Sequence, residues 1–448
     1  MGDDERFDVV ISGGGMTGGM LAAALAAPIA GAGGASTAPA MDAPPGATTD
    51  DRRPVAPLRV CVLEAARPEP FAPGTDPGID IRVSALSIAT ERMFRRVGAW
   101  DGVVSRRACP YREMVVWDGV AGGGDDASSG FGPDPERLRT RFDADEIDAD
   151  ALGHIVENRV VQLALLECLE RAPNVTVKCP ERLASFRVTD KESVIELESG
   201  TTLRARLLVG ADGAGSTVRT MAGIEHDRSA YDQHALVATV RTALPQQSVT
   251  WQRFVPSGPQ AFLPLAGPHA SMVWYHEADE VARLSALDDA AFAREMEAAF
   301  PAELGGIDAV LARASFPIAK AHASRYIEER VALIGDAAHT VHPLAGQGVN
   351  LGMLDAAALA EVLLEAAGAG RDIGRLRTLR RYERWRRGEN AMMIAALDGF
   401  HHAFGPQPAP LRVLRRLALG AADRAGPLKR LVMRRAMGTV GDLPALAR

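Results

Sequence analysis

The chain is 448 residues long, with 47% hydrophobic and 24% charged residues and a formal net charge of −7. This composition is typical of a folded globular enzyme with more than one domain and excludes a disordered chain. The acidic balance gives no overall attraction for nucleic acid, so no nucleic-acid partner is expected.

Four cysteines are spread along the chain without the Cys-x-x-Cys or Cys/His spacing of a zinc site: Cys61, Cys109, Cys168 and Cys179. No metal is therefore expected, and the sparse use of cysteine favours a reducing compartment. Residues 9–41 carry no charge, but the acidic start at Asp3 and Asp4 and the interruption by Pro28 argue against a signal peptide or membrane span. We therefore expect a cytoplasmic protein.

The N-terminal part of the chain has the pattern of a strand-turn-helix unit followed by another strand. The predicted elements are a buried strand, a tight turn, a small-residue helix and a second buried strand, over residues 7–12, 13–18, 20–27 and 58–63. Between helix and second strand, residues 30–57 are rich in Gly, Ala, Pro and Thr and predict an inserted loop.

The middle and C-terminal parts alternate between helical and strand patterns. Helices are predicted over 84–97, 157–170, 288–299 and 348–366. Strands are predicted over 175–178, 184–188, 194–198, 202–209, 314–322 and 330–335. Alternating segments within 234–276, separated by turn signals, predict an antiparallel sheet that is inserted into the first domain, and 119–150 predicts mostly solvated loop.

The first motif that carries chemistry is Gly13, Gly15 and Gly18 between a strand and a helix. Such glycines let the backbone approach a pyrophosphate, which the helix N-terminus stabilises. Glu64, at the end of the next strand, is placed to accept hydrogen bonds from ribose hydroxyls and disfavours a 2′-phosphate, so FAD or NAD is expected rather than NADP. The inserted loop explains the long spacing from Gly18 to Glu64. The alternative is a glycine-rich turn without a ligand.

The second and third motifs each place an aspartate just beyond a buried strand. They are Asp212 with Gly213, and Gly335 with Asp336. Ligands of open α/β sheets collect at the carboxyl ends of the strands, which favours a binding role. For either aspartate, the alternative is an N-cap at a strand-helix turn.

The three motifs, in this order, resemble the single-component flavoprotein monooxygenases of the p-hydroxybenzoate hydroxylase type. The run 339–352, His-Thr-Val-His-Pro-Leu-Ala-Gly-Gln-Gly-Val-Asn-Leu-Gly, is similar to the signature of the ubiquinone-biosynthesis hydroxylases in particular. Three further segments support the likeness: 80–86, 156–159 and 258–265. It extends from Phe7 to about Tyr382.

This resemblance implies an α/β fold, with a Rossmann-like FAD-binding domain of the glutathione-reductase type and an interleaved antiparallel β-sheet substrate domain. The FAD-binding domain is expected from three parts, 1–110, 151–225 and 319–400. A loop-rich segment that joins the substrate domain, the substrate sheet itself and a basic helical tail are expected over 111–150, 226–318 and 401–448.

The resemblance also implies FAD as cofactor, NAD(P)H as transient reductant and O2 as co-substrate. The implied reaction is hydroxylation of the aromatic ring of a polyprenylated phenol in ubiquinone biosynthesis, with a ubiquinone-biosynthesis complex as a partner. The single glycine motif agrees with the absence of a separate nicotinamide domain. The alternatives are another flavoprotein aromatic hydroxylase, an isoprenoid-chain reductase, or a non-enzymatic flavin-binding component of a biosynthetic complex.

In such a family Asp336 would hold the ribityl chain, while Asp212 and Gly213 would lie by the pyrophosphate. The residues expected to bind the cofactor are Gly13, Gly15, Met16, Thr17, Gly18, Glu64, Arg82, Arg159, Asp212, Gly213, Gly335, Asp336, Pro343, Gly348, Val349 and Asn350. The expected catalytic residues are Arg82, Pro343, Gly346 and Gln347.

Two chemical arguments support these residues. Backbone N–H groups of 348–350, at a helix N-terminus, could stabilise negative charge at flavin N1 and the C2 carbonyl. Arg82 supplies a second positive group, unless it is a surface arginine opposite Asp80. His339 and His342 lack a third ligand in sequence reach, so structural roles around the flavin loop are expected for them instead of metal binding.

The substrate is expected between sheet and flavin, in an apolar pocket lined by Phe262, Leu263, Pro264 and Trp274, with core packing as the alternative for each. In the tail, residues 411–435 mix leucines and valines with Arg and Lys. This pattern predicts a peripheral contact with an anionic inner membrane surface, or else a helix that packs on its own protein or a partner.

Overall fold

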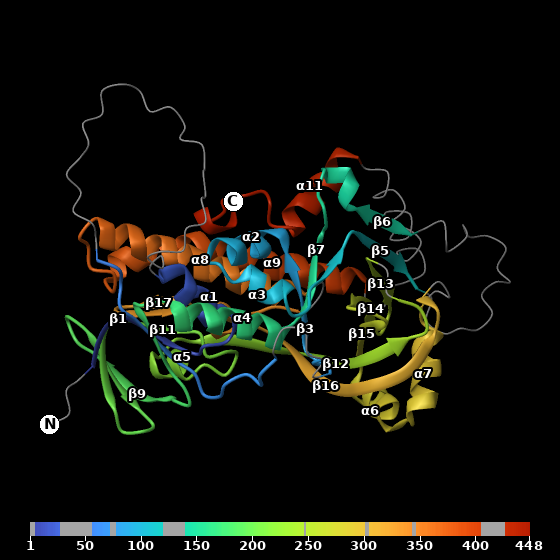
Figure 1. Ribbon diagram of the computed structural model, residues 1–448, viewed down its shortest axis with the longest axis horizontal. Coiled ribbons are helices and arrows are strands. Elements are labelled where there is room, and N and C mark those ends of the chain that lie inside the picture. The colour runs from blue at the N-terminus through green and yellow to red at the C-terminus, as the bar shows by residue number, and fades with distance from the viewer. Residues whose placement is uncertain are drawn as a thin grey trace.

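The computed structural model describes residues 5–26, 56–71, 78–119, 139–245, 248–300, 304–342, 346–404 and 426–448. Two large sheets and one small sheet organise these residues, with helices packed against them (Figure 1). Proline 343 and most of the predicted 30–57 loop lie outside the described residues.

The first sheet has a core of five parallel strands. Their order is β18 (Val331–Leu333), β11 (Thr202–Gly210), β1 (Glu5–Ser12), β2 (Val60–Leu63) and β8 (Val175–Lys178). Further strands pair antiparallel at its sides: β17 (Ile327–Glu328), β10 (Ser193–Leu197) and β9 (Leu183–Val188). Ser12 pairs with both Leu63 and Gly210, so three strands end together at one edge of the sheet. This central edge, between connections that run to either side, is where open α/β folds bind ligands.

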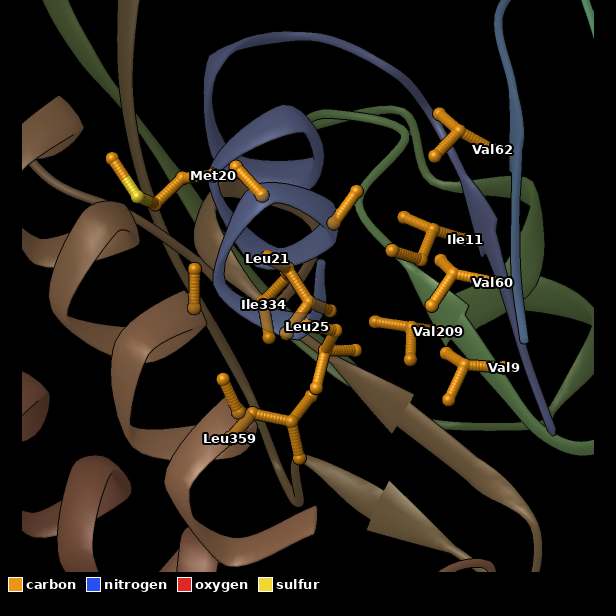
Figure 2. Close-up of a cluster of buried hydrophobic side chains, with 14 of the residues drawn as sticks. Val9, Ile11, Met20, Leu21, Leu25, Val60, Val62, Val209, Ile334 and Leu359 are labelled. Atoms are coloured by element: carbon orange, nitrogen blue, oxygen red, sulfur yellow. The ribbon is translucent and has the colours of Figure 1, made fainter. Parts of the chain in front are cut away.

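Helices α1 (Met16–Leu25), α4 (Asn158–Arg171), α8 (Gln347–Gly368) and α9 (Leu376–Phe404) pack around this sheet. Figure 2 shows the apolar core, in which Ile11 and Val209 from the strands face Leu21 and Leu25 of α1, with Leu359 of α8 nearby. These five side chains are at most 2% exposed, and burying each contributes about 1.5 to 3 kcal/mol.

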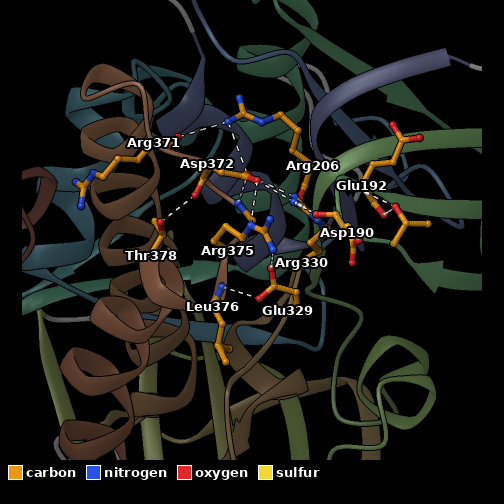
Figure 3. A network of polar contacts seen from close by, with 12 residues as sticks. Asp190, Glu192, Arg206, Glu329, Arg330, Arg371, Asp372, Arg375, Leu376 and Thr378 are labelled. Carbon is orange, nitrogen blue, oxygen red and sulfur yellow. Dashed lines mark hydrogen bonds and ion pairs between the residues drawn. The ribbon is translucent and has the colours of Figure 1, made fainter.

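At the opposite end of β18, the buried Arg330 cross-links the sheet (Figure 3). Its guanidinium pairs with Asp372 at 2.7 Å and donates to the carbonyl oxygens of Asp190 and Arg206. A buried charge is tolerated only when it is paired and hydrogen-bonded in this way.

The second sheet is mostly antiparallel and contains two 17-residue strands, β12 (His226–Thr242) and β16 (Ile307–Ala323). The strand order is β19 (His339–Thr340), β16, β12, β15 (His269–His276), β14 (Gly258–Leu265), β13 (Val249–Val255), β5 (Glu113–Asp118) and β6 (Thr140–Asp143). Helices α6 (Ala278–Ala286) and α7 (Asp289–Glu297) cover one face, and the end of α9 contributes Phe404 to the other (Figure 1).

The third sheet joins β3 (Val83–Ser87), β7 (Gly153–Glu157) and β4 (Cys109–Tyr111). The other described helices are α2 (Ile88–Arg96), α3 (Trp100–Val104), α5 (Thr217–Met221) and α11 (Pro427–Ala436), with 3-10 turns η3 (Ala144–Ile147), η5 (Gly335–Ala337) and η7 (Ala445–Ala447).

Several expected elements differ from those in the structure. Residues 84–87 form a strand and not the start of a helix, because they pair with β7; the helix begins only after Ser87, whose side chain accepts from the N–H of Thr90. The 111–150 segment contributes β5 and β6 to the second sheet, so it is more than a loop. Helix α1 starts at Met16, four residues earlier than predicted.

Candidate functional site: a dinucleotide cradle

The glycine turn after β1 is packed against the second motif so closely that side chains could not fit. A Cβ atom on Gly13 would lie 2.4 Å from the carbonyl oxygen of Ala211, and one on Gly18 would lie 1.9 Å from that of Gly13. Gly13 also has φ +101°, a conformation that glycine adopts readily. The turn leads into α1, which begins after Gly15 and has no acidic residue in its first turn, so its free N–H groups favour an anion.

Glu64 lies beside this turn, although fifty residues separate it from Gly14. Its Oε2 accepts from the N–H of Gly14 at 2.7 Å, and its Oε1 accepts from the N–H of Ala66 at 3.1 Å. The parallel pairing of β1 with β2 brings the two together. A carboxylate here is where the sequence predicted an acceptor for ribose hydroxyls.

The third motif meets the first at Thr17. A Cβ atom on Gly335 would lie 2.9 Å from Thr17 Oγ1, and one on Gly352 of α8 would lie 2.7 Å from the same atom. Small residues therefore let α1, the η5 turn and α8 approach one another. Asp336 projects from this turn with an exposed side chain. Protein atoms crowded around the carboxyl raise the pKa of Asp336, while the charges of His339 and Arg82 act to lower it.

Arg82 is held at the edge of the cradle by the 156–159 segment. The buried Glu157 accepts from the N–H of Asp80 at 2.8 Å, and the N–H of Asn158 donates to the carbonyl of Arg82 at 2.9 Å. The Arg82 side chain is exposed and has no ion-pair partner among the described residues; Asp80 accepts only its backbone N–H. Pairing with a surface acid is thus not its role in this structure.

Arg159, at the start of α4, has close partners of its own. Its guanidinium lies 3.6 Å from Glu157 and 3.5 Å from Glu69, and stacks over Phe71 at 5.3 Å. With a side chain that is 13% exposed, it packs beside the cradle. A cofactor contact of Arg159 stays a prediction.

A second helix N-terminus reaches the site at α8. Gly346 is its N-cap and has φ +62°. Ala85 of β3 packs against this glycine so closely that a Cβ on residue 346 would lie 3.1 Å from the Cβ of Ala85. Gln347, Gly348 and Val349 form the first turn, where no acidic residue occurs and N–H groups lack partners within the helix.

The side chain of Asn350 fixes this turn to β3 and α2. Its Oδ1 accepts from the N–H of Ser87 at 2.9 Å and the hydroxyl of Thr90 at 2.8 Å, while Nδ2 donates to the carbonyls of Ala85 and Gly346. It is 4% exposed. The side chain of Asn350 therefore positions the α8 N-terminus. Only its backbone N–H is left for the predicted role, which is to stabilise negative charge on the bound cofactor.

Asp212 takes the capping role that was the alternative for it. Its carboxylate accepts from the hydroxyl of Ser216 at 2.5 Å and from the N–H groups of Thr217 and Val218. These bonds close the turn before α5. A contact of Asp212 or Gly213 with a nucleotide stays a prediction.

Two structural residues of the site were missed by sequence reasoning. Arg219, which is 6% exposed, donates to the carbonyl oxygens of Ala214 and Ala337, both at 2.9 Å, and so joins the second motif to the third. Asp355, fully buried on α8, binds the third motif through His339. Its signal was available: Asp355 is the one charged residue between His342 and Glu361 in an otherwise uncharged run.

The two histidines of the signature have separate surroundings. His339 Nε2 lies 2.5 Å from Asp355, whereas the ring of His342 contacts the rings of Tyr231 and Tyr275 at centroid distances of 4.8 and 5.4 Å. In the part of the chain that the structure describes, no group of three or more His, Cys, Asp or Glu residues is placed to hold a metal ion.

The four residues expected to line the substrate pocket lie on opposite faces of the second sheet. Phe262 and Trp274, 2% and 6% exposed, belong to the core beneath α6 and α7 with Phe292. Side chains alternate along a strand, so Pro264 shares the face of Phe262, and Leu263 points to the other face. The expectation of a pocket made by all four is therefore corrected: Phe262 and Trp274 are core residues.

The face of Leu263 is the one that His342 contacts. Tyr275 alternates with Trp274 on β15 and so lies on this face, where it contacts His342, the residue just before 343–348. Burial raises the pKa of both Tyr231 and Tyr275, which keeps these phenols neutral.

Together these residues fit a bound FAD. The glycine cradle with the α1 N-terminus matches a pyrophosphate, and the α8 N-terminus matches a flavin carbonyl edge; neither helix has an acidic residue in its first turn. The carboxylates of Glu64 and Asp336 match a ribose and a polyhydroxyl chain. The parallel sheet with one such cradle and an interleaved antiparallel sheet defines a flavoprotein with a single dinucleotide-binding domain.

Comparisons with known proteins agree with this class. Residues 79–394 match the family model described as FAD binding domain. The chain is 39% identical to a 3-demethoxyubiquinol 3-hydroxylase of Escherichia coli, covering 85% of this chain and 92% of that protein. It is 36% identical to ubiquinone hydroxylase UbiL of Rhodospirillum rubrum, covering 98% and 91%, and 32% identical to human mitochondrial ubiquinone biosynthesis monooxygenase COQ6, covering 96% and 92%.

Solved structures show the same fold at lower identity. p-Nitrophenol 4-monooxygenase PnpA of Pseudomonas putida superposes with a TM-score of 0.71 at 19% identity, over 97% of this chain and 98% of that one. Klebsiella pneumoniae R204Q HpxO complexed with FAD gives 0.66 at 17% identity, over 97% and 99%. The chain belongs to the ubiquinone-biosynthesis hydroxylase family of FAD-dependent aromatic monooxygenases.

Proposed function

We propose that this protein hydroxylates the aromatic ring of a polyprenylated phenol precursor of ubiquinone, with FAD as cofactor, NAD(P)H as transient reductant and O2 as co-substrate. The observation that carries the proposal is the convergence of Thr17, Gly335 and Gly352 at one cradle, in a chain with named ubiquinone hydroxylases as relatives. Bound FAD would supply the activation of O2. The protein would bind and orient the cofactor and the substrate, and it would exclude water from them.

The residues divide these tasks. The α1 N-terminus and the Gly13 turn would receive the pyrophosphate, Glu64 the ribose, and Asp336 the ribityl hydroxyls. The first-turn N–H groups at Gly348 and Val349 would face the flavin carbonyl edge, where negative charge develops on reduction. Arg82, without an ion-pair partner among the described residues, would add a positive charge at the same edge.

We place the substrate ring on the face of the second sheet that carries Leu263 and Tyr275. Leu263, Tyr231 and Tyr275 would meet it there, next to His342. The phenols stay neutral and the cluster is apolar in character, which suits a prenylated ring.

The deciding experiment uses the full chain loaded with FAD, a short-chain polyprenylphenol and 18O2. Hydroxylation predicts that the substrate stimulates NAD(P)H oxidation and that the product gains one 18O atom. A product with two added hydrogens and no 18O would indicate an isoprenoid-chain reductase, and unstimulated NAD(P)H oxidation would indicate a non-enzymatic flavin-binding component. Asp336→Ala, which should lose FAD, serves as the matched blank.

A peripheral membrane contact is a second part of the proposal, favoured by the outer face of α11. Leu428, Leu431 and Val432 are 62%, 55% and 54% exposed, and they share the helix with Arg430 and Arg435. An amphipathic helix with apolar and basic side chains suits an anionic lipid surface, where a polyprenylated substrate resides.

Other features of the tail limit which residues can take part. Lys429 is buried and pairs with Glu146 at 2.7 Å, so its charge serves the protein interior and not the outer face. Residues 405–425, including the predicted basic positions Arg412, Arg415 and Arg416, lie outside the described residues. Of the helices described, none is long and apolar enough to span a bilayer.

A further inference from the structure

Asp355 uses both of its carboxylate oxygens although it is completely buried. Oδ2 accepts from the N–H of Gly335 at 3.2 Å and lies 2.5 Å from Nε2 of His339. Oδ1 accepts from Nε of Arg386 at 2.9 Å and from Nδ2 of Asn390 at 3.0 Å. Arg386 and Asn390 are themselves 1% and 0% exposed, so one carboxylate joins α8, α9 and the η5 turn in the interior.

The consequence concerns the turn that carries Asp336. One oxygen atom holds both ends of the five-residue segment from Gly335 to His339, and Asp336 projects from between them. Tyr326 stacks on the His339 ring with an interplanar angle of 26° and receives a hydrogen bond from Asn390. The imidazole is thus fixed in position as well as in orientation.

We propose that Asp355 is a positioning residue for the cofactor: through Gly335 and His339 it fixes the turn that presents Asp336 and keeps the imidazole beside that carboxyl. The inference rests on the proposed role of Asp336 in holding FAD. It gives a function to a buried cluster that does not itself reach the cradle.

The electrostatics of the pair agree with this assignment. Burial alone would raise the pKa of Asp355, but the charge and hydrogen bond of His339, with Arg386 and Asn390, lower it to about 2. For Asp336, protein atoms around the carboxyl raise the pKa, and the electrostatic effects of His339 and Arg82 oppose that rise. His339 in turn is faced by Asp355 of α8, Arg386 of α9, Tyr326 and, through Tyr326, His322 of β16.

The sign of the pH effect follows. FAD held by an ionised Asp336 is released as the pH falls through the pKa of that carboxyl. Removing the His339 imidazole, whose electrostatic effect lowers the pKa of Asp336, leaves the rise caused by the surrounding protein atoms less opposed, so Asp336 becomes protonated at a higher pH. The release midpoint, defined as the pH at which log Kd for FAD begins to rise as the pH falls, should therefore move upward. A purely structural weakening raises Kd at every pH and leaves this midpoint in place.

The test is FAD titration of the full chain, followed by flavin fluorescence from about pH 5 to about pH 8 with thermal unfolding measured in parallel. We expect His339→Gln and Asp355→Asn to raise the Kd for FAD about tenfold or more at neutral pH, and His339→Gln also to raise the release midpoint by about one pH unit. Asp372→Asn, which breaks the Arg330 ion pair at the other end of β18, is the matched control: it should lower the Tm and leave the midpoint in place.

Unchanged FAD affinity and midpoint in both His339→Gln and Asp355→Asn would overturn the inference. Asp336→Asn separates this failure from that of the proposed site. If Asp336→Asn binds FAD like the wild type, the role of Asp336 itself is wrong; if it binds weakly while the other two variants do not, only the positioning role is wrong. Should Asp355→Asn not fold, His339→Gln decides alone.

Discussion

Arg219 donates a hydrogen bond to the carbonyl oxygen of Ala337 at 2.9 Å, and so ties the residues after β11 to those after β18. The same guanidinium donates to Ala214 within its own segment. One buried side chain therefore holds the second and third motifs of the cradle at a fixed distance. Arg219 and Ala337 are more than a hundred residues apart in the sequence.

Replacing this arginine tests the link between the two motifs. Arg219→Met keeps the bulk but leaves two carbonyls without their donor, and it should lower the free energy of unfolding by about 3 kcal/mol and weaken FAD binding. Urea denaturation and FAD titration measure the two effects. Arg204→Met is the control, since Arg204 pairs with Glu192 in a more exposed position and should cost about 1 kcal/mol or less. Equal losses in both variants would refute the link.

The contact between Thr17 and Gly352 predicts a compensating pair of substitutions. Gly352→Ala would place a methyl group 2.7 Å from Thr17 Oγ1 and should lower FAD occupancy, with an overpacking cost of about 1 to 3 kcal/mol. Thr17→Ala removes the obstructing atoms, so the double variant should recover much of the thermal stability. The bound flavin per chain and the Tm give the readout. Failure of Thr17→Ala to restore any stability would show that the clash lies elsewhere.

Asn350→Asp tests how the α8 N-terminus is positioned. The aspartate keeps the shape but cannot donate to the carbonyls of Ala85 and Gly346, and its charge would oppose the anion-binding role of the helix end. FAD affinity should fall at least tenfold. Asn174→Asp changes an amide that likewise donates to two carbonyls, those of Leu25 and Leu58, away from the cradle. The control should lose stability without losing FAD affinity.

The two faces of β14 should respond differently to mutation. Leu263→Trp should raise the KM for a short-chain polyprenylphenol without displacing FAD, because Leu263 points toward the proposed substrate space. Phe262→Leu should instead lower stability by about 1 to 3 kcal/mol and leave KM unchanged, because Phe262 packs beneath α6 and α7. Steady-state kinetics and thermal unfolding separate the cases, and a raised KM in Phe262→Leu alone would reverse the assignment of faces.

The outer face of α11 should govern binding to vesicles. Replacing Leu428, Leu431 and Val432 together with Ser should reduce sedimentation with anionic vesicles. High salt should reduce sedimentation of the wild type as well, because each basic side chain contributes about 1 kcal/mol near such a surface and salt screens this attraction. Leu311→Ser, at a leucine that is 48% exposed on β16, is the control. Equal sedimentation of the triple variant and the wild type would exclude this helix as the contact.

The sequence alone determined the class of fold and the location of the cradle. Gly13, Gly15 and Gly18 after a buried strand, and acids after two more strands, could be placed together because parallel strands end at one edge of a sheet. Each motif is a short sequence pattern that can be recognised by itself, and the order of the three motifs along the chain predicted that they form one cradle.

Only the tertiary structure decided which side chains line the cradle and which support it. Phe262 and Leu263 are adjacent apolar residues with no sequence feature to assign their faces; the helices that cover one side of the sheet make that choice. Asn350 and Asp355 of α8 likewise have partners on other elements, and packing between those elements sets them. The hydrogen bonds of Asn350 join residues that are far apart in the sequence. Such bonds form only when the whole fold brings the elements together, so no local pattern predicts them.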